Sequence, residues 1–461
     1  MSSSDPLVTR LRSVLGDKGV LDDPDVLDAH RNDHATFCTA GVPRVLVRPS
    51  STAEVSEVLK AAGEFGVPVV AQGTRTGLSG AANAIDGCLL LSTSRMNRVL
   101  EVSVEDQVAV VQPGVVNAEL SRAVLEQGLF YPPDPSSWEM STVGGNIATN
   151  AGGLCCVKYG VTSDFVRGLE VVLASGEVVR TGRRSAKGVA GYDLTRLIVG
   201  SEGTLGVVTE ATLALRPAPE AALTAAATFL SIEDGIAAAA AVMASGLRPS
   251  LLEFLDGPTA RAIQDYRDMG LPADVGSLLI AQSDRGPRAA EDVARIAAIC
   301  SEHGAVEVAE ASDAEESRML LEARRLVNAA LEPLGVTLVD DVAVPRSKLV
   351  ALLRGIAEIG TKYDVLICCP GHVGDGNMHP TVIFDRHDPA AEARALEAFG
   401  AVMDLGLALG GTITGEHGIG TLKTRWLEQE LGPAGLDLQR RIKQAFDPGN
   451  LLNPGKVLER F

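Results

Sequence analysis

The sequence contains no apolar run of about 18 residues, the length that a transmembrane helix needs. The segment from Met1 to Val20 also lacks the apolar core of a secretory signal. These two absences indicate a cytoplasmic protein with no integral membrane segment. Peripheral attachment to a membrane stays open, because binding at a membrane surface requires no such run.

Positive charge is also in short supply. The chain has 41 Lys and Arg residues against 59 Asp and Glu residues, which gives a formal net charge of −18 and a pI near 4.9. Nucleic acids and anionic lipids repel such a chain, so the charge argues against unassisted binding to either. The same charge favours solubility.

Cysteine is scarce and is not arranged for cross-linking. The seven cysteines include two adjacent pairs, Cys155-Cys156 and Cys368-Cys369, and none is spaced as CxxC. This pattern argues against a disulfide framework and against an iron–sulfur cluster within the chain. We therefore expect reduced thiols. If electron transfer requires a one-electron relay, that relay would have to be in another protein.

The length and composition of the chain predict a globular protein with several domains. Its 461 residues exceed what one hydrophobic core usually serves, so two or three domains are expected. Residues 43–72 have the pattern of a β-α-β unit, and residues 216–219, Arg-Pro-Ala-Pro, are typical of a domain boundary. After about residue 220, strand and helix patterns alternate, which predicts an antiparallel sheet with helices on one face.

Two glycine-rich segments are typical of backbone that approaches a large ligand closely. Residues 72–82 follow a predicted strand and combine glycines with hydroxyl residues, which suits backbone N–H groups that bind an anion such as a pyrophosphate. They match neither the GxGxxG nor the P-loop pattern, and alone they would favour a structural turn. Residues 141–153 add a density of Gly, Asn and Thr without charge, which supports a planar or phosphorylated ligand.

Three of the seven histidines lie in two short glycine-rich stretches, residues 371–379 and 414–418. His372, His379 and Glu416 form a three-ligand set that suits zinc or another divalent transition metal with one position left open. His417 follows Glu416 directly and would point beside the metal. Asp375 could be a further ligand, but it is expected to brace the turn or a histidine instead. A glycine-flanked histidine can also merely satisfy hydrogen bonds in a buried loop, but the grouping favours a site.

A predicted helix over residues 313–330 carries two adjacent arginines, Arg324 and Arg325. Adjacent helical residues point about 100° apart, so only one of the two can face inward. An inward arginine suits a planar carboxylate, which its guanidinium binds with two parallel hydrogen bonds. Two solvated arginines are the alternative, and this stretch alone leaves both interpretations open.

From about residue 43 to the end, these motifs together resemble the flavoprotein family that includes D-lactate dehydrogenases, the glycolate oxidase flavin subunit and D-2-hydroxyglutarate dehydrogenase, within the vanillyl-alcohol oxidase superfamily. The resemblance implies an α+β fold with a two-subdomain FAD-binding domain and a cap (substrate) domain built on an antiparallel sheet. It divides the chain into an N-terminal helical segment (1–42), the FAD-binding domain (43–218), the cap domain (219–410) and a C-terminal segment that returns to the FAD domain (411–461).

The resemblance also assigns roles to individual residues. It implies that His372, His379 and Glu416 bind the metal, that His417 is the catalytic base and that Arg324 binds the substrate carboxylate. FAD is expected to bind without a covalent link, because the pyrophosphate loop contains neither histidine nor cysteine. The positions that correspond to FAD contacts are Gly73, Thr74, Arg75, Thr76, Gly77, Leu78, Ser79, Gly80, Ala81, Pro133, Asp134, Ser141, Thr142, Gly144, Gly145, Asn146, Gly152, Gly153, Gly203, Gly206, Val208 and Asn453.

Two departures from the family pattern bear on the substrate. Pro380-Thr381 follows His379 where the 2-hydroxyglutarate enzymes have a polar substrate contact, and Val339 stands where they have a lysine. Both departures argue against a pocket for a second carboxylate. They favour a short hydroxy acid such as lactate or glycolate.

The expected activity is FAD- and divalent-metal-dependent oxidation of a D-2-hydroxy acid, with D-lactate or glycolate favoured, to the 2-oxo acid by hydride transfer to flavin. The alternatives are a D-2-hydroxyglutarate dehydrogenase and, from another class, a non-catalytic flavin- and metal-binding subunit of a larger redox complex. A metal-free flavin oxidase would have no use for the gathered histidines. The expected partners are the hydroxy acid, a second copy in a homodimer, and an external electron acceptor: a quinone, a cytochrome, an electron-transfer flavoprotein or an iron–sulfur subunit.

Overall fold

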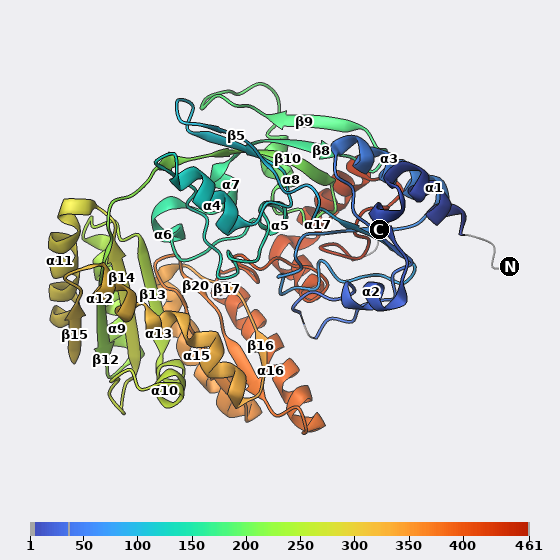
Figure 1. Ribbon diagram of the computed structural model, residues 1–461. Coiled ribbons are helices and arrows are strands. Elements are labelled where there is room, and N and C mark those ends of the chain that lie inside the picture. Colours follow the sequence, from blue (N-terminus) through green and yellow to red (C-terminus); the bar gives the residue numbers. More distant parts are fainter. Residues whose placement is uncertain (1–4, 36, 460–461) are drawn as a thin grey trace. The chain divides into compact units, whose positions relative to one another are not determined.

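The computed structural model describes residues 5–35 and 37–459, which form two compact units (Figure 1). Unit 1 comprises the described residues up to Gly153, Val161–Ala218, and those from Glu416 onward. Unit 2 comprises Leu154–Gly160 and Pro219–Gly415. The four-segment division expected from the sequence, with 1–42 and 411–461 as segments of their own, stays a prediction.

The first sheet of unit 1 contains the predicted β-α-β unit with one strand inserted. Its order is β1-β2-β4-β3, and β4 pairs in parallel with both β2 and β3. The connecting helix begins where the hydroxyl of Ser51 accepts a hydrogen bond from the backbone N–H of Glu54, and it ends at Gly66, whose φ of 62° is left-handed. The elements are β1 (Val20–Leu21), β2 (Val45–Val47), α3 (Thr52–Phe65), β3 (Val69–Gln72) and β4 (Leu89–Ser92).

The second sheet of unit 1 is antiparallel, with the order β5-β6-β10-β8-β9, and a two-stranded pair β11-β7 accompanies it. These strands are β5 (Val99–Ser103), β6 (Val108–Val111), β7 (Leu129–Phe130), β8 (Val166–Val172), β9 (Val178–Gly182), β10 (Val207–Ala214) and β11 (Arg216–Pro217). The remaining helices of this unit are α1 (Pro6–Leu15), η1 (Asp17–Gly19), α2 (Pro24–Ala29), α4 (Asn117–Leu125), α5 (Val143–Thr149), α7 (Thr162–Phe165), α8 (Leu194–Ile198), η5 (Thr424–Trp426) and α17 (Leu427–Phe446).

Unit 2 is built on an antiparallel sheet with the order β15-β12-β14-β13-β19-β20-β17, beside a three-stranded sheet β16-β21-β18. The strands are β12 (Leu223–Phe229), β13 (Leu251–Asp256), β14 (Ser277–Ser283), β15 (Glu307–Glu310), β16 (Val336–Val339), β17 (Val342–Ala343), β18 (Leu366–Cys368), β19 (Gly371–His372), β20 (Asn377–Met378) and β21 (Thr381–Phe384).

Helices cover both faces of the larger sheet, and the expectation of one covered face is wrong. On one face, Leu251 packs in an apolar cluster with Ile263 of α10 and Val327 of α14. On the other face, α9 lies so close to β13 that a Cβ added at Gly235 would be 3.0 Å from the ring of Phe254. The sequence does contain a signal for two covered faces. It is the mainly apolar run of β13, which is typical of a strand buried on both faces. These helices are α9 (Ile232–Ala244), α10 (Gly257–Tyr266) and α11 (Ala289–Glu302).

The helix predicted over residues 313–330 is divided into three short helices. The divisions fall at Leu321 and Leu326, where ψ is −12° and −9°, which departs from the helical value near −42°. The resulting turns bury Ala323 in the apolar cluster under the sheet. The elements are α12 (Ala314–Leu320), α13 (Glu322–Arg325) and α14 (Val327–Leu331), and unit 2 also contains α6 (Cys156–Tyr159), η2 (Gly286–Arg288), η3 (Glu332–Leu334), η4 (Arg346–Lys348), α15 (Leu349–Tyr363) and α16 (Pro389–Ala408).

Among the described helices, none combines the length and the hydropathy that crossing a membrane would demand.

Candidate functional site: a cavity in unit 1 and a buried polar cluster in unit 2

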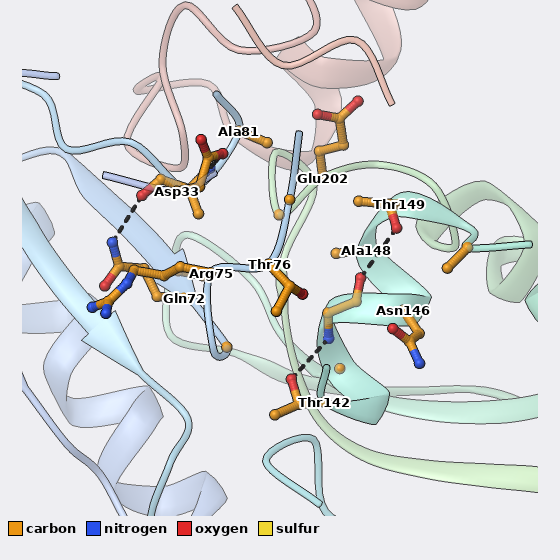
Figure 2. Close-up of a pocket in the computed structure, with 18 of the residues that line it drawn as sticks. Asp33, Gln72, Arg75, Thr76, Ala81, Thr142, Asn146, Ala148, Thr149 and Glu202 are labelled. Carbon is orange, nitrogen blue, oxygen red and sulfur yellow. Dashed lines mark hydrogen bonds between the residues drawn. The ribbon is translucent and has the colours of Figure 1, made fainter. Parts of the chain in front are cut away.

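Unit 1 encloses a cavity with about 1350 Å³ of space, part of it open to solvent. Its walls come from the loop after β3, from helix α5, from the loop before β10 and from the C-terminal segment. Figure 2 shows Arg75, Thr76 and Ala81 from the loop, together with Thr142, Asn146 and Thr149 at and within α5. The two glycine-rich segments of the sequence therefore face one cavity.

Most residues expected to contact FAD line this cavity. They are Gly73, Thr74, Arg75, Thr76, Gly77, Leu78, Ser79, Ala81, Thr142, Gly144, Gly145, Asn146, Gly203, Gly206, Val208 and Asn453. The others expected in that role are in unit 1 but are not among the lining residues: Gly80, Pro133, Asp134, Ser141, Gly152 and Gly153.

The loop after β3 is held by hydrogen bonds at its base. Gln72 donates from Nε2 to the carbonyl of Ala82 at 2.8 Å, and the Thr74 hydroxyl donates to the carbonyl of Met140 at 2.8 Å. Between these anchors Arg75 adopts a φ of 63°, in the left-handed region that side chains seldom occupy. Such strain is typical of segments that clamp a ligand.

The glycines of the cavity wall differ in what surrounds them. At Gly144 an added Cβ would come within 2.6 Å of Pro113, so packing of the protein itself requires the glycine. At Gly77 an added Cβ would meet only a carboxylate oxygen of Asp33, at the ordinary contact distance of 3.5 Å. The absence of a side chain at Gly77 therefore leaves room in the cavity.

The cavity is also lined by residues that were not individually expected to contact FAD, of which Glu202 and Asp33 are titratable. Glu202 is buried, has a φ of 50°, and accepts hydrogen bonds from the backbone N–H groups of Ile419 and Gly420. Burial raises the pKa of its carboxyl to about 7. Burial also raises the pKa of Asp33. The remaining residues of this kind are Ala71, Gln72, Ala82, Thr93, Pro113, Pro135, Ser136, Ser137, Ala148, Thr149, Ala151, Ile198, Ser201 and Val207.

A signal for Glu202 was present in the sequence Ser201-Glu202-Gly203, where a charged residue precedes a glycine between two apolar runs. Three of the non-glycine residues with positive φ, Arg75, Glu202 and Asn453, line the same cavity. That strain is visible only in the backbone of the folded chain, which is why the sequence did not reveal it.

The walls of the cavity fit FAD in chemistry as well as in shape. Four buried polar atoms in the lining residues have no hydrogen-bond partner among the described residues: Gln72 Oε1, Ser79 Oγ, Asn146 Nδ2 and Asn453 Oδ1. Buried polar atoms normally have partners. Both donors and acceptors are included, which suits a ligand such as FAD that carries both kinds of group.

Unit 2 contains a buried polar cluster in which Glu253 is central. Its Oε2 accepts a hydrogen bond from Nε of Arg324 at 2.6 Å, and its Oε1 lies 2.6 Å from Nδ1 of His372. Burial raises the pKa of the Glu253 carboxyl, but His372 and Arg324 outweigh burial and hold that pKa below its usual value. Arg324 is thus the inward-facing arginine, whereas Arg325 is exposed.

The second expected metal ligand lies beside the first. The rings of His372 and His379 are 5.0 Å apart at an angle of 85°. Nδ1 of His379 is 3.7 Å from Oδ1 of Asp341, a buried carboxylate that also accepts hydrogen bonds from Asn377 at 2.8 Å and Thr414 at 2.7 Å. The cluster therefore presents two imidazoles, each with a buried carboxylate on its Nδ1 side.

The remaining expected residues are Glu416, His417 and Asp375. Glu416 and His417 belong to unit 1, where both line the cavity, and His417 Nε2 is 4.0 Å from a carboxylate oxygen of Glu416. Asp375 is exposed at the turn after His372, and its backbone N–H donates to the carbonyl of His372 at 3.0 Å. This backbone hydrogen bond lies within the turn that Asp375 was expected to brace.

Comparisons with known proteins identify the family of the chain. Residues 43–182 match the family "FAD binding domain", and residues 218–457 match "FAD linked oxidases, C-terminal domain". The chain is 45% identical over 422 residues to the glycolate oxidase subunit GlcD of Bacillus subtilis (strain 168), covering 91% of this chain and 90% of that protein. It is 35% identical over 453 residues to the D-lactate dehydrogenase of Anaerostipes hadrus, covering 95% and 94%.

The solved structure of p-cresol methylhydroxylase with substrate bound has a TM-score of 0.80 to this chain at 19% sequence identity, covering 99% of this chain and 97% of that one. A likeness at this identity shows the fold alone. It confirms the expected α+β fold of the vanillyl-alcohol oxidase type. Together with the two family matches, it means that the chain belongs to the FAD-linked oxidases and is an FAD-binding oxidoreductase.

Proposed function

We propose that the protein oxidises a D-2-hydroxy acid, with D-lactate or glycolate favoured, to the 2-oxo acid, using non-covalently bound FAD and one divalent metal, for which zinc is the first choice. The observation that carries this proposal is the buried cluster of unit 2, where Glu253 contacts both Arg324 and His372 and the ring of His379 lies beside that of His372. The names of the relatives, a glycolate oxidase subunit and a D-lactate dehydrogenase, support the same substrate class.

Two bound groups would supply chemistry that side chains lack. FAD supplies a two-electron acceptor for the α-hydrogen of the substrate. The metal supplies a Lewis acid that lowers the pKa of the substrate hydroxyl. We assign His372, His379 and Glu416 to hold the metal, because two imidazoles and a carboxylate suit a divalent transition ion with a position left open.

Arg324 binds the carboxylate of the substrate in this proposal. Its guanidinium carries five N–H donors, and the one on Nε is already donated to Glu253. The terminal nitrogens are left for a second carboxylate, which a guanidinium binds with two parallel hydrogen bonds. Arg324 is largely buried, with a side chain 14% exposed, and partial burial strengthens such a charged pair.

His417 accepts the proton of the substrate hydroxyl. An imidazole is suited to this step because it changes protonation state near neutral pH. The protein's residues thus have three roles: Arg324 orients the acid, His372, His379 and Glu416 would hold the metal, and His417 accepts the proton of the hydroxyl.

Two residues that are paired in the structure support the preference for a short substrate. Val339 of β16 is the register partner of Thr381 in β21, so the two positions that depart from the 2-hydroxyglutarate enzymes are neighbours. Neither side chain carries a charge that would bind a second carboxylate. D-2-hydroxyglutarate is therefore the second candidate, ranked below D-lactate and glycolate.

The test is anaerobic reduction of the purified yellow protein. Addition of D-lactate or glycolate should bleach the flavin absorbance, with L-lactate as the stereochemical control and D-2-hydroxyglutarate as the competing substrate. A protein that no 2-hydroxy acid bleaches would instead fit a non-catalytic subunit of a redox complex. Acid precipitation should release all the flavin, since flavin retained in the pellet would contradict non-covalent binding.

The metal is tested by exhaustive chelation. Removal of the metal should abolish turnover while FAD stays bound, and Zn²⁺ should restore it. Alanine at His372 or His379 should lower bound metal and turnover together. Full activity after chelation would remove the metal from the proposal and leave the flavin chemistry standing.

After oxidation of the substrate, the electrons must leave to an external acceptor, because we propose no second redox centre in this chain. A quinone, a cytochrome, an electron-transfer flavoprotein and an iron–sulfur subunit are the candidates. The word "subunit" in the name of the Bacillus subtilis relative supports a complex with a partner.

A further inference from the structure

The carboxylate of Glu253 connects two side chains that have different roles in the proposed function. One oxygen is 2.6 Å from Nε of Arg324 and the other is 2.6 Å from Nδ1 of His372. Glu253 itself has no solvent exposure, and the side chains of Arg324 and His372 are 14% and 7% exposed. Each carboxylate oxygen therefore has its own donor.

The position of Glu253 is otherwise suited to a hydrocarbon side chain. It lies in the middle of β13, on the face whose other residues, Leu251 and Leu255, pack in the apolar cluster of unit 2. Its register partner in β14 is Ile280, from the same cluster. A well-packed apolar residue usually stabilises such a position as well as a buried ion pair does. The charge at this position therefore calls for a reason other than stability.

We propose that Glu253 is a positioning residue that sets the orientation of both His372 and Arg324. The inference rests on the proposed function, in which these two residues bind the metal and the substrate carboxylate. No residue of β13 was among those expected to act in the site.

The first consequence concerns the tautomer of His372. A carboxylate accepts hydrogen bonds only, so Nδ1 must carry the proton that faces Glu253. Nε2 then carries the lone pair and is the nitrogen that can bind a metal. A carboxylate behind a metal-binding histidine also makes the ligand nitrogen more basic and restricts rotation of the ring.

The second consequence concerns Arg324. Because Nε is bonded to Glu253, the edge of the guanidinium that contains both terminal nitrogens is the edge left for a planar carboxylate. The same glutamate thus fixes which edge meets the substrate. Since one residue sets both orientations, its replacement should weaken metal binding and substrate binding together.

The test is Glu253→Gln, which keeps the size of the side chain but offers one acceptor oxygen where two donors need one each. Either Arg324 or the Nδ1–H of His372 would face an NH₂ group, and the imidazole would adopt the other tautomer or turn. We expect binding of Zn²⁺ to the FAD-loaded protein, measured by competition with a chelator, to weaken roughly 10–100-fold. The KM for D-lactate should rise by roughly tenfold or more. FAD content should not change.

The matched control is Asp256→Asn in the same strand. Asp256 is also a buried carboxylate, but it accepts hydrogen bonds from the backbone N–H and hydroxyl of Thr259 at the start of α10 and from the backbone N–H of Cys369, and neither residue is expected to act in the site. Its replacement should leave the affinity for Zn²⁺ and the KM for D-lactate unchanged. Glu253→Asp serves as the second variant if Glu253→Gln does not fold, because it keeps the charge but is one methylene too short to reach both partners.

Several outcomes would overturn the proposal. Parental affinity for Zn²⁺ together with a parental KM in a folded Glu253→Gln protein would do so, as would a change in thermal stability alone. A parent protein that binds no Zn²⁺ would also overturn it. A parent that binds Zn²⁺ but oxidises no 2-hydroxy acid would defeat the proposed function instead, and the Zn²⁺ affinities of the two proteins would then decide the role of Glu253 by themselves.

Discussion

Two buried glutamates, Glu202 in unit 1 and Glu253 in unit 2, show how differently the two halves of the protein are built. Burial acts against the charge of both, yet the pKa of Glu202 is raised to about 7 whereas the pKa of Glu253 is lowered. Glu202 accepts hydrogen bonds from two backbone N–H groups, whereas Glu253 contacts an arginine and a histidine. At Glu202 burial outweighs the two N–H groups and the more distant charges of Lys456 and Lys423, whereas at Glu253 the histidine and the arginine together outweigh burial.

The same difference extends to the surroundings of each glutamate. The cavity of unit 1 is lined mainly by glycines and small uncharged side chains, which leave space for a ligand. The cluster of unit 2 consists of charged groups and rings that bond to one another. Substitutions that add atoms should therefore weaken ligand binding in the cavity. Substitutions that remove atoms should instead disrupt the hydrogen bonds of the cluster. The predictions below test this contrast, from the largest expected effect to the smallest.

His417 lies in the cavity wall, but its proposed role is chemical. Removal of its side chain should therefore have a large effect, in contrast to the expectation for the rest of the cavity. His417→Ala should slow anaerobic flavin reduction by D-lactate roughly 10²–10⁴-fold while leaving FAD bound and substrate binding largely intact. The residual rate should no longer fall at acid pH through an imidazole pKa. Stopped-flow reduction across pH measures both effects. His387→Ala, at an exposed histidine, is the control, and a His417 variant reduced as fast as the parent would rule out the assignment.

Glu202 predicts a pH dependence of stability. Its pKa rises from 4.5 in the unfolded chain to about 7 in the folded protein, so between these values the folded state holds a proton that the unfolded state lacks. The free energy of unfolding should therefore fall as pH rises through this window. The total fall across the window should be about 3 kcal/mol. Denaturant titrations from pH 4.5 to 8 measure it. Glu202→Gln should reduce the slope, and an identical slope in the variant would contradict the prediction.

Arg324 and Arg325 provide a matched pair in the second region. Arg324→Ala should raise the substrate dissociation constant about 10–100-fold, because a charged hydrogen bond contributes about 1.5–3 kcal/mol. It should also destabilise unit 2, since Glu253 would lose a cation while buried. Arg325→Ala, at the exposed neighbour, should change neither quantity. Saturation of the flavin reduction rate with D-lactate measures binding, and equal behaviour of the two variants would move the carboxylate site elsewhere.

Gly77 tests the prediction that added atoms harm the cavity. Gly77→Leu should weaken FAD binding roughly tenfold or more while the protein still folds, because its Cβ would meet no close neighbour and the side chain would enter the cavity. FAD content and reconstitution of the deflavinated protein measure it. Gly63→Leu in α3, where an added Cβ meets nothing within 4 Å, is the control. Full flavin occupancy in the Gly77 variant would mean that this wall does not touch the cofactor.

Local sequence patterns predicted many of the elements. The apolar run Thr381–Phe384 is a strand, and the alanine-rich segment Ile232–Ala244 is a helix. Ser51, a residue type that is favoured before the first turn of a helix, caps α3. These features depend on neighbours in sequence, which is why propensity and capping were sufficient to find them.

The predictions failed where long-range packing overrides local preference. The helix expected over residues 313–330 is interrupted at Leu321 and Leu326. Helix α10 covers a face of the sheet that was expected to be bare. The β-α-β unit was found, but β4, which comes later in the chain, lies between its two strands. The interruption of the helix and the position of β4 cannot be read from a short window of residues, whereas the apolar run of β13 was a local signal for the second covered face.

For the site, the sequence by itself determined which residue types are available: two glycine-rich segments, the histidines His372 and His379, and an arginine pair on one helix. It did not determine that Arg324 faces inward, that Glu253 holds it, or that Glu202 lines the cavity. Those facts depend on contacts between residues 71 to 217 positions apart. Glycine marks a motif through its own backbone freedom, whereas a buried carboxylate acquires its role only from the partners that tertiary packing places beside it.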